Sequence, residues 1–186
     1  MRPLPIAAFL LPIFSAISPS NAILPSCSQE AAFTISSISY SSYIAASNVT
    51  FPDQTTSSLS ISFSVTNNAT GVQTACSFIH SLSYQGGRWN VDPIIWHPCG
   101  ERTMSWDGGK GGFSFEVETM ASFGWSSWVV GVQQTWVCRD TGVGPLIERN
   151  GTASATLVPA CSTTSTDSST SEECTGPDMV AFALLE

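Results

Sequence analysis

Two glutamates have the spacing that most resembles a catalytic pair in this sequence. Glu116 and Glu118 are two residues apart in an alternating segment, so on a strand their carboxyl groups leave the same face roughly 6 to 7 Å apart. That separation falls within the range of about 5 to 9.5 Å found between paired glycosidase carboxylates. A solvated outer face opposite Phe113, Phe115 and Val117 has the same pattern, and we favour this interpretation.

The two histidines are the other candidates for acid–base chemistry. His80 lies on the apolar parity of the alternating segment 76–84, so its ring is expected to point into the core. His97 lies at a strand end, where a base could work. The sequence contains no Gly-x-Ser-x-Gly elbow, and cysteine pairing would leave no thiol free. We therefore predict no catalytic residue and no enzyme activity.

The sequence also lacks the motifs of metal and phosphate sites. No two cysteines are spaced as Cys-x-x-Cys, and two histidines do not complete a zinc ligand set, so we expect no metal and no cofactor. The glycine-rich run 107–112 contains Lys110, but it leads into the alternating segment 113–118 rather than a helix. A P-loop requires that helix, so the run is interpreted as a hairpin turn.

Tryptophan is abundant in this chain and could supply binding surface. Trp128 and Trp136 follow the parity of an alternating segment and are expected in the core. Trp106 and Trp125 lie near turns, so we predict that these two are exposed and bind a sugar or a protein partner.

Length, leader and charge limit the class of protein. Residues 1–22 combine Arg2, a short apolar run and Ser20-Asn21-Ala22, which is typical of a cleaved secretory signal peptide rather than a membrane anchor. Residues 23–161 are long enough for one domain with its own core. The formal net charge of −8 repels phosphate backbones and anionic membranes, so binding to nucleic acid or membrane is not expected.

The cysteines and sequons agree with export. Six cysteines in an oxidising compartment are expected to form bridges, and fifteen pairings are open to them. Three N-glycosylation sequons begin at Asn48, Asn68 and Asn150, each in or beside a predicted turn. The cysteines are Cys27, Cys76, Cys99, Cys138, Cys161 and Cys174.

The hydrophobic pattern predicts an all-β domain. Alternation is clearest at 59–66 and recurs at 76–84, 113–118, 127–138 and 152–158. A change of phase at Ser36-Ser37 predicts a β-bulge, and 44–58 and 140–149 resemble loops. We predict an antiparallel β-barrel over residues 23–161, with a β-sandwich as the alternative. Residues 162–186 are predicted to form an acidic, Ser/Thr-rich tail whose first part is disordered.

The order of these features resembles the Alternaria major-allergen family of fungal secreted proteins. The resemblance covers about residues 27–161. It rests on Cys27, Thr74-Ala75-Cys76-Ser77, Trp96-His97-Pro98-Cys99-Gly100, Phe113-Ser114-Phe115 and Trp136-Val137-Cys138, followed by an alanine-rich closing strand.

The resemblance implies a small disulfide-bonded β-barrel that acts by binding. It implies a bridge from Cys76 to Cys99 and a second bridge at Cys138, whose family partner just upstream is absent here. We take Cys161 as the substitute partner. Cys27 matches a position that can link two subunits as a homodimer, and Cys174 offers it an intramolecular alternative.

Two functions follow for a protein of this kind. The first is an effector-like or allergen-like protein that binds a host extracellular protein, with plant defence proteins of the thaumatin-like class implied by the resemblance. The alternative is a carrier or lectin-like module for a small phenolic ligand or a sugar.

Overall fold

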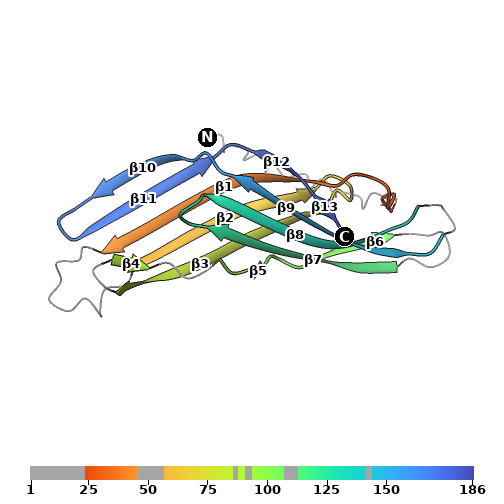
Figure 1. The fold of residues 1–186 in the computed structure, drawn as a ribbon, viewed down its shortest axis with the longest axis horizontal. Helices are drawn as coiled ribbons and strands as arrows, with labels where there is room; N and C mark the ends of the chain where they lie inside the picture. The colour runs from red at the N-terminus through yellow and green to blue at the C-terminus, as the bar shows by residue number, and fades with distance from the viewer. Residues whose placement is uncertain (1–23, 46–56, 86–87, 91–93, 107–112, 141–143) are drawn as a thin grey trace, which may run out of the picture.

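A computed structural model describes residues 24–45, 57–85, 88–90, 94–106, 113–140 and 144–186, with backbone alone for 83–85, 88–90 and 106. Within these ranges the regular structure is β-strand, which confirms the all-β prediction (Figure 1). No helix in the described residues is long and apolar enough to cross a bilayer. The strands are β1 (Ala32–Ala45), β2 (Ser57–Asn67), β3 (Gln73–Gln85), β4 (Arg88–Asn90), β5 (His97–Pro98), β6 (Arg102–Trp106), β7 (Phe113–Gly124), β8 (Val129–Cys138), β9 (Ile147–Thr156), β10 (Ala160–Ser165), β11 (Ser169–Gly176), β12 (Met179–Phe182) and β13 (Leu184–Leu185).

The strands form two antiparallel sheets. The first sheet has the order β10-β11-β1-β2-β3-β4, and β12 also pairs with β1. The second has the order β13-β9-β8-β7-β5, and β6 also pairs with β7. Figure 1 shows the long strands lying along the long axis of the molecule. Among the described residues no continuous ladder closes the sheets into a barrel, and both contribute to one core.

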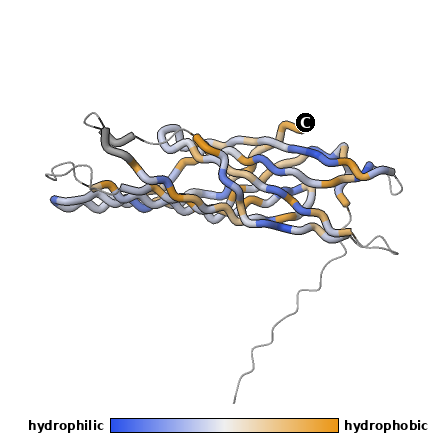
Figure 2. Tube along the Cα trace, turned by 90° about the horizontal axis from the view of Figure 1, so that it is seen from below, coloured by the Kyte–Doolittle hydropathy of each residue, from blue (hydrophilic) through white to orange (hydrophobic). Residues whose placement is uncertain are grey.

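Alternation along each strand produces this core. In β2 every second residue from Ser57 to Asn67 is buried, and Figure 2 shows apolar and polar stretches alternating along the chain. Phe33, Ile61 and Val65 of the first sheet meet Val130 and Val132 of the second. The predicted bulge is confirmed, because the β1–β2 register shifts between Ser36 and Ser39, and Ser37 has a φ of 55°.

A buried polar chain joins the two sheets inside this core. Gln134 on β8 accepts a 2.8 Å hydrogen bond at Oε1 from Asn67 Nδ2, at the end of β2. Its Nε2 donates a 2.8 Å bond to Thr119 Oγ1 on β7, which lies 3.4 Å from Thr74 Oγ1 on β3. Because all four residues are buried, these bonds satisfy groups that water does not reach.

The two sheets are connected to each other along both sides. On one side Cys76 of β3 is bonded to Cys99, just after β5, and Gly100 N donates a 2.8 Å bond to Ala75 O. On the other side the C-terminal segment passes from the first sheet, through β12, to the second, through β13. Between these strands Ala183 N donates a 2.9 Å bond to Ala31 O.

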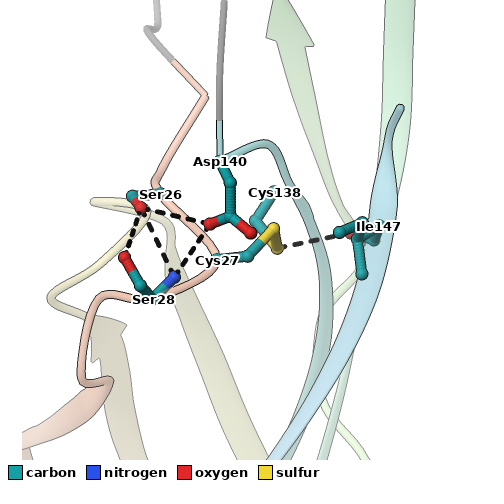
Figure 3. Close-up of a disulfide and its surroundings, with 6 residues drawn as sticks. All are labelled: Ser26, Cys27, Ser28, Cys138, Asp140 and Ile147. Carbon is teal, nitrogen blue, oxygen red and sulfur yellow. Dashed lines mark hydrogen bonds between the residues drawn. A yellow bond between two sulfur atoms is a disulfide. The ribbon is translucent and has the colours of Figure 1, made fainter. Parts of the chain in front are cut away.

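The other two disulfides correct the pairing expected from the sequence. Cys138, at the end of β8, is bonded to Cys27, and Asp140 beside it accepts hydrogen bonds from Ser26 and Ser28 (Figure 3). The pairings of Cys138 with Cys161 and of Cys27 with Cys174 are therefore wrong, as is a bridge between subunits through Cys27.

Cys161 is instead bonded to Cys174 because the two residues lie directly opposite each other in the β10–β11 hairpin. The predicted disorder of the tail is also wrong, since residues 160–176 form this hairpin and 179–185 form β12 and β13. The loop predicted at 140–149 ends earlier than expected, at the start of β9.

Candidate functional site

Two candidate sites, one outer and one inner, contain residues at or next to β5. β5 is a two-residue strand paired with β7, with His97 opposite Ala121 and Pro98 opposite Met120. Trp96, just before β5, lies on the outer face of the second sheet, where its ring approaches Gly131 of β8. His97 is half-buried and its ring contacts the inner residues Phe78 and His80.

The outer site is a groove of about 350 Å³ across β7, β8 and β9. Four apolar side chains line it and are unusually exposed: Ile94 by 62%, Trp96 by 40%, Phe182 by 76% and Leu184 by 79%. The remainder of the lining consists of three hydroxyl residues, two small residues and one valine, namely Ser122, Thr152, Ser154, Gly131, Ala153 and Val129. The groove therefore combines apolar contact surface with hydrogen-bonding hydroxyl groups.

Gly131 leaves the space that the Trp96 indole occupies. A Cβ atom at this position would lie 3.1 Å from Cη2 of Trp96, closer than ordinary van der Waals contact, and would also meet the Ser122 hydroxyl. A side chain at position 131 would therefore push the indole away from the sheet. The C-terminal segment, coloured as hydrophobic near the C-terminus in Figure 2, also contributes Phe182 and Leu184 to the lining of the groove.

The inner site is a histidine pair that joins the two sheets. Nε2 of His80 on β3 lies 3.1 Å from Nε2 of His97 on β5, within hydrogen-bond distance. The Phe78 ring stacks on His97 with centroids 4.5 Å apart and planes 10° apart. The sequence predicts the inward position of His80, which is 6% exposed, but not its contact with His97.

Trp125 belongs to this inner site rather than to the surface. Its ring lies 5.1 Å from His80, 4.7 Å from Phe123 and 5.8 Å from Tyr40, so the prediction that it is exposed is wrong. The cause is that the turn after β7 folds back over the core. Its Nε1 is buried and has no hydrogen-bond partner in the described structure. The other tryptophan that we predicted to bind, Trp106, ends β6, and its side chain lies outside the described residues.

The phenol of Tyr40 belongs to this cluster and has a raised pKa. It packs edge-on against Trp128, with ring centroids 4.9 Å apart. Burial raises the pKa of its phenol above 10.0, the Glu172 carboxylate raises it further, and a hydrogen bond to Ser42 partly opposes both effects. The phenol therefore stays protonated, and so neutral, at physiological pH.

The glutamate pair occupies a separate surface region. Glu116 and Glu118 are both exposed on β7, whereas Val117 between them is buried, as the outer-face interpretation predicts. They border a groove of about 380 Å³ beside the Cys76–Cys99 bridge, together with Glu101 and Arg102. Enzymes that use paired carboxylates set their environments apart so that one stays protonated, and two exposed glutamates lack that difference in burial.

The remaining sequence features do not form a reactive centre in the described structure. Cys161, Glu172 and Cys174 place ligand atoms within 4.8 Å of one another, but the two sulfur atoms are bonded to each other. The strands on either side of residues 107–112 pair from Trp106 to Phe113, as expected for a hairpin, while the run itself lies outside the described residues.

The three sequons differ in position. Asn68 is exposed in the β2–β3 turn, where its Oδ1 accepts a bond from Thr34. Asn150 lies within β9 rather than beside a turn, and its Oδ1 is buried without a partner in the described structure. Asn48 lies outside the described residues. N-glycosylation remains a prediction at each position.

Sequence reasoning missed the groove because its two walls come from distant segments. Trp96 and Phe182 are brought together only by the placement of β5 and β12 around the second sheet. The available signal was the apolar C-terminal run 179–185, which a solvated tail would not need.

Comparisons with known proteins give one structural likeness. No family model and no curated protein sequence matches the chain. Among solved structures, the chain is similar to the crystal structure of the Alternaria alternata allergen Alt a 1, with 15% sequence identity and a TM-score of 0.37. The likeness covers 83% of this chain and 88% of that chain.

Proposed function

We propose that this chain is an exported, non-enzymatic recognition protein that binds a host extracellular protein through the groove on the second sheet. The observation that carries the proposal is the exposure of Ile94, Trp96, Phe182 and Leu184 around one groove. Soluble proteins rarely expose neighbouring large apolar side chains without a partner. Aromatic residues of this kind dominate the binding energy of protein interfaces.

Charge and covalent structure agree with this role. Three disulfides and no free cysteine suit an oxidising extracellular environment. The net charge of −8 favours a basic partner, because opposite charges speed the encounter of two proteins. A basic plant defence protein of the thaumatin-like class, the partner that the family resemblance implies, has the required charge.

The proposal is tested by measuring binding to a purified basic thaumatin-like protein with surface plasmon resonance. Phe182→Ser removes the most exposed aromatic wall, and we expect it to weaken binding by roughly tenfold or more, as for a hot-spot residue. Ile79→Ser is the matched control, because Ile79 is 70% exposed on β3, away from the groove. Equal affinities for the wild type and Phe182→Ser would contradict a role for the groove.

The second candidate function is a carrier of a small amphipathic ligand. The observation that favours it is the hydroxyl lining of the groove beside Trp96, which suits a phenolic or sugar ligand. Saturable quenching of tryptophan fluorescence by a flavonoid, lost when Ser154→Leu fills the groove, would support this function. Unchanged fluorescence at millimolar ligand would exclude it.

A further inference from the structure

The histidine pair has a feature that neither proposed binding function uses. His80 and His97 are the two histidines of the whole sequence, and their Nε2 atoms meet 3.1 Å apart although the residues belong to different sheets. All six cysteines are in disulfides. With no free thiol, imidazole nitrogen is the ligand of this chain that best suits a divalent transition metal ion, and both of its imidazoles are at one place.

The separation of the two nitrogens suits two ligands of one metal ion. Metal–imidazole bonds are about 2.0 to 2.1 Å long. With an angle between 90° and 109° at the metal, two such bonds place the nitrogens about 2.9 to 3.4 Å apart. The observed 3.1 Å lies inside this range. Each ring must turn by roughly 40° so that its lone pair leaves the line joining the nitrogens and points at the ion.

The pair is also held in place by its surroundings. His97 lies against the Phe78 ring, and the Trp125 ring lies 5.1 Å from His80. The Cys76–Cys99 bridge joins the same two segments of chain a short distance away. The fold therefore brings both ligands together before an ion binds, which lowers the entropy cost of binding it.

We propose that His80 and His97 form a two-histidine site for a divalent first-row transition metal ion, with Cu(II) bound most tightly. Without a metal ion, the Nε2 of one ring donates a hydrogen bond to the Nε2 of the other. On metal binding the donating ring moves that proton to its Nδ1 and stays neutral, so both Nε2 lone pairs can face the ion. Imidazole suits copper, nickel and zinc, and copper binds most strongly in this series.

Trp125 Nε1, which has no hydrogen-bond partner among the described residues, is a second observation that agrees with this site. A buried N–H group without an acceptor is uncommon and calls for an explanation. Water or hydroxide completes the coordination of an ion held by two protein ligands, and its oxygen can accept from a neighbouring donor. The indole ring that carries this N–H group lies next to His80, with ring centroids 5.1 Å apart.

The experiment uses the full secreted protein, oxidised and without a histidine tag. We expect isothermal titration with Cu(II) to show one ion per chain, accompanied by quenching of tryptophan fluorescence from Trp125. His97→Gln removes one ligand at a half-buried position, and we expect roughly a hundredfold weaker binding with the thermal transition retained. Because this variant keeps the amino terminus and all carboxylates, it also corrects for binding elsewhere on the chain.

A second measurement needs no variant. Electron paramagnetic resonance of the Cu(II) form is expected to show hyperfine splitting from two nitrogens, and the splitting changes when histidine is labelled with ¹⁵N. Equal Cu(II) affinity in the wild type and His97→Gln, or a spectrum that ¹⁵N-histidine does not change, would overturn the proposal. Neither result would affect the groove, because binding of the basic protein partner is measured separately with Phe182→Ser.

Discussion

Gln134 shows how a single polar residue can belong to a hydrophobic core. It interrupts the apolar face of β8, between Val132 and Trp136, yet it is 1% exposed. Its amide group has both a donor and an acceptor, so it can bond Asn67 from one sheet and Thr119 from the other. An apolar residue here would leave two buried groups unpaired.

The stability of the fold is expected to depend strongly on this amide. Gln134→Ala should lower the free energy of unfolding by about 2 to 5 kcal/mol, because Asn67 and Thr119 each lose a buried partner. Urea denaturation measures this change. Gln133→Ala is the control, since Gln133 is adjacent, half-buried and on the opposite face. Equal losses in the two variants would mean that the buried bonds contribute nothing specific.

Tyr40 gives the fold a sensitivity to alkaline pH. Its pKa is raised in the folded state, so between pH 10 and the folded pKa the native protein keeps a proton that the unfolded chain has released. The resulting stabilisation is complete below pH 10 and is lost as the pH rises through the folded pKa. Tyr40→Phe has no such ionisation.

We therefore expect the wild type to lose more stability than Tyr40→Phe between about pH 8 and about pH 11, as measured by urea midpoints. Tyr43→Phe removes an exposed phenol from the same strand and serves as the control for the loss of a hydroxyl group. A parallel decline of wild type and Tyr40→Phe would show that burial of the phenol has no such effect.

Strands were predictable from the sequence where apolar and polar residues alternate strictly along the chain. The segment 59–66 falls inside β2, and the phase change at Ser36-Ser37 locates a real bulge. The C-terminal hairpin was not predictable, because Ser162–Glu173 contains no large apolar residue to mark an inner face. It forms because β11 pairs with β1 along eight residue positions. This pairing is made by backbone hydrogen bonds, which leave no pattern in the side chains.

The disulfides illustrate the same limit. Cys27 and Cys138 lie 111 residues apart, and only the packing of the N-terminal segment against the end of β8 brings them together. Cys161 and Cys174 are 13 residues apart and need only the local hairpin. In the chain-entropy view, a bridge that closes a longer loop restricts the unfolded chain more.

Replacing both cysteines of a bridge with serine should therefore have unequal effects. We expect Cys27→Ser with Cys138→Ser to cost about 4 to 5 kcal/mol, and Cys161→Ser with Cys174→Ser about 3 kcal/mol. Denaturation of the two double variants under identical conditions measures the difference. A larger loss from the hairpin bridge would contradict the loop-length argument.

At the scale of the whole molecule, the candidate sites depend on how the two sheets meet. The sequence places His80 correctly in the core, and it suggests His97 as a separate residue at a strand end. Their contact follows from the junction of β3 with β5, and the groove follows from the crossing of the C-terminal segment. Neither juxtaposition can be read from a local pattern, because each joins elements of different sheets.

Net charge belongs to this scale as well. With 14 acidic and 6 basic residues, the chain attracts a basic partner electrostatically. The range of this attraction decreases as the salt concentration rises. Raising NaCl from about 50 mM to about 500 mM should lower the association rate with a basic thaumatin-like protein, while dissociation from the apolar groove changes little. Stopped-flow or surface plasmon resonance separates the two rates. An association rate independent of salt would remove charge from the recognition mechanism.

The pairing of β1 with both β11 and β12 also affects biosynthesis. β1 is among the first strands to emerge from a ribosome or a translocation channel, yet its outer edge is covered only when residues 169–182 have followed. Until then the strand presents unpaired backbone groups to other nascent chains, and the core it shares with the second sheet stays open. The first sheet is therefore completed only after residues 169–182 have been synthesised, and we expect chaperones that shield exposed strand edges to raise the yield of folded protein.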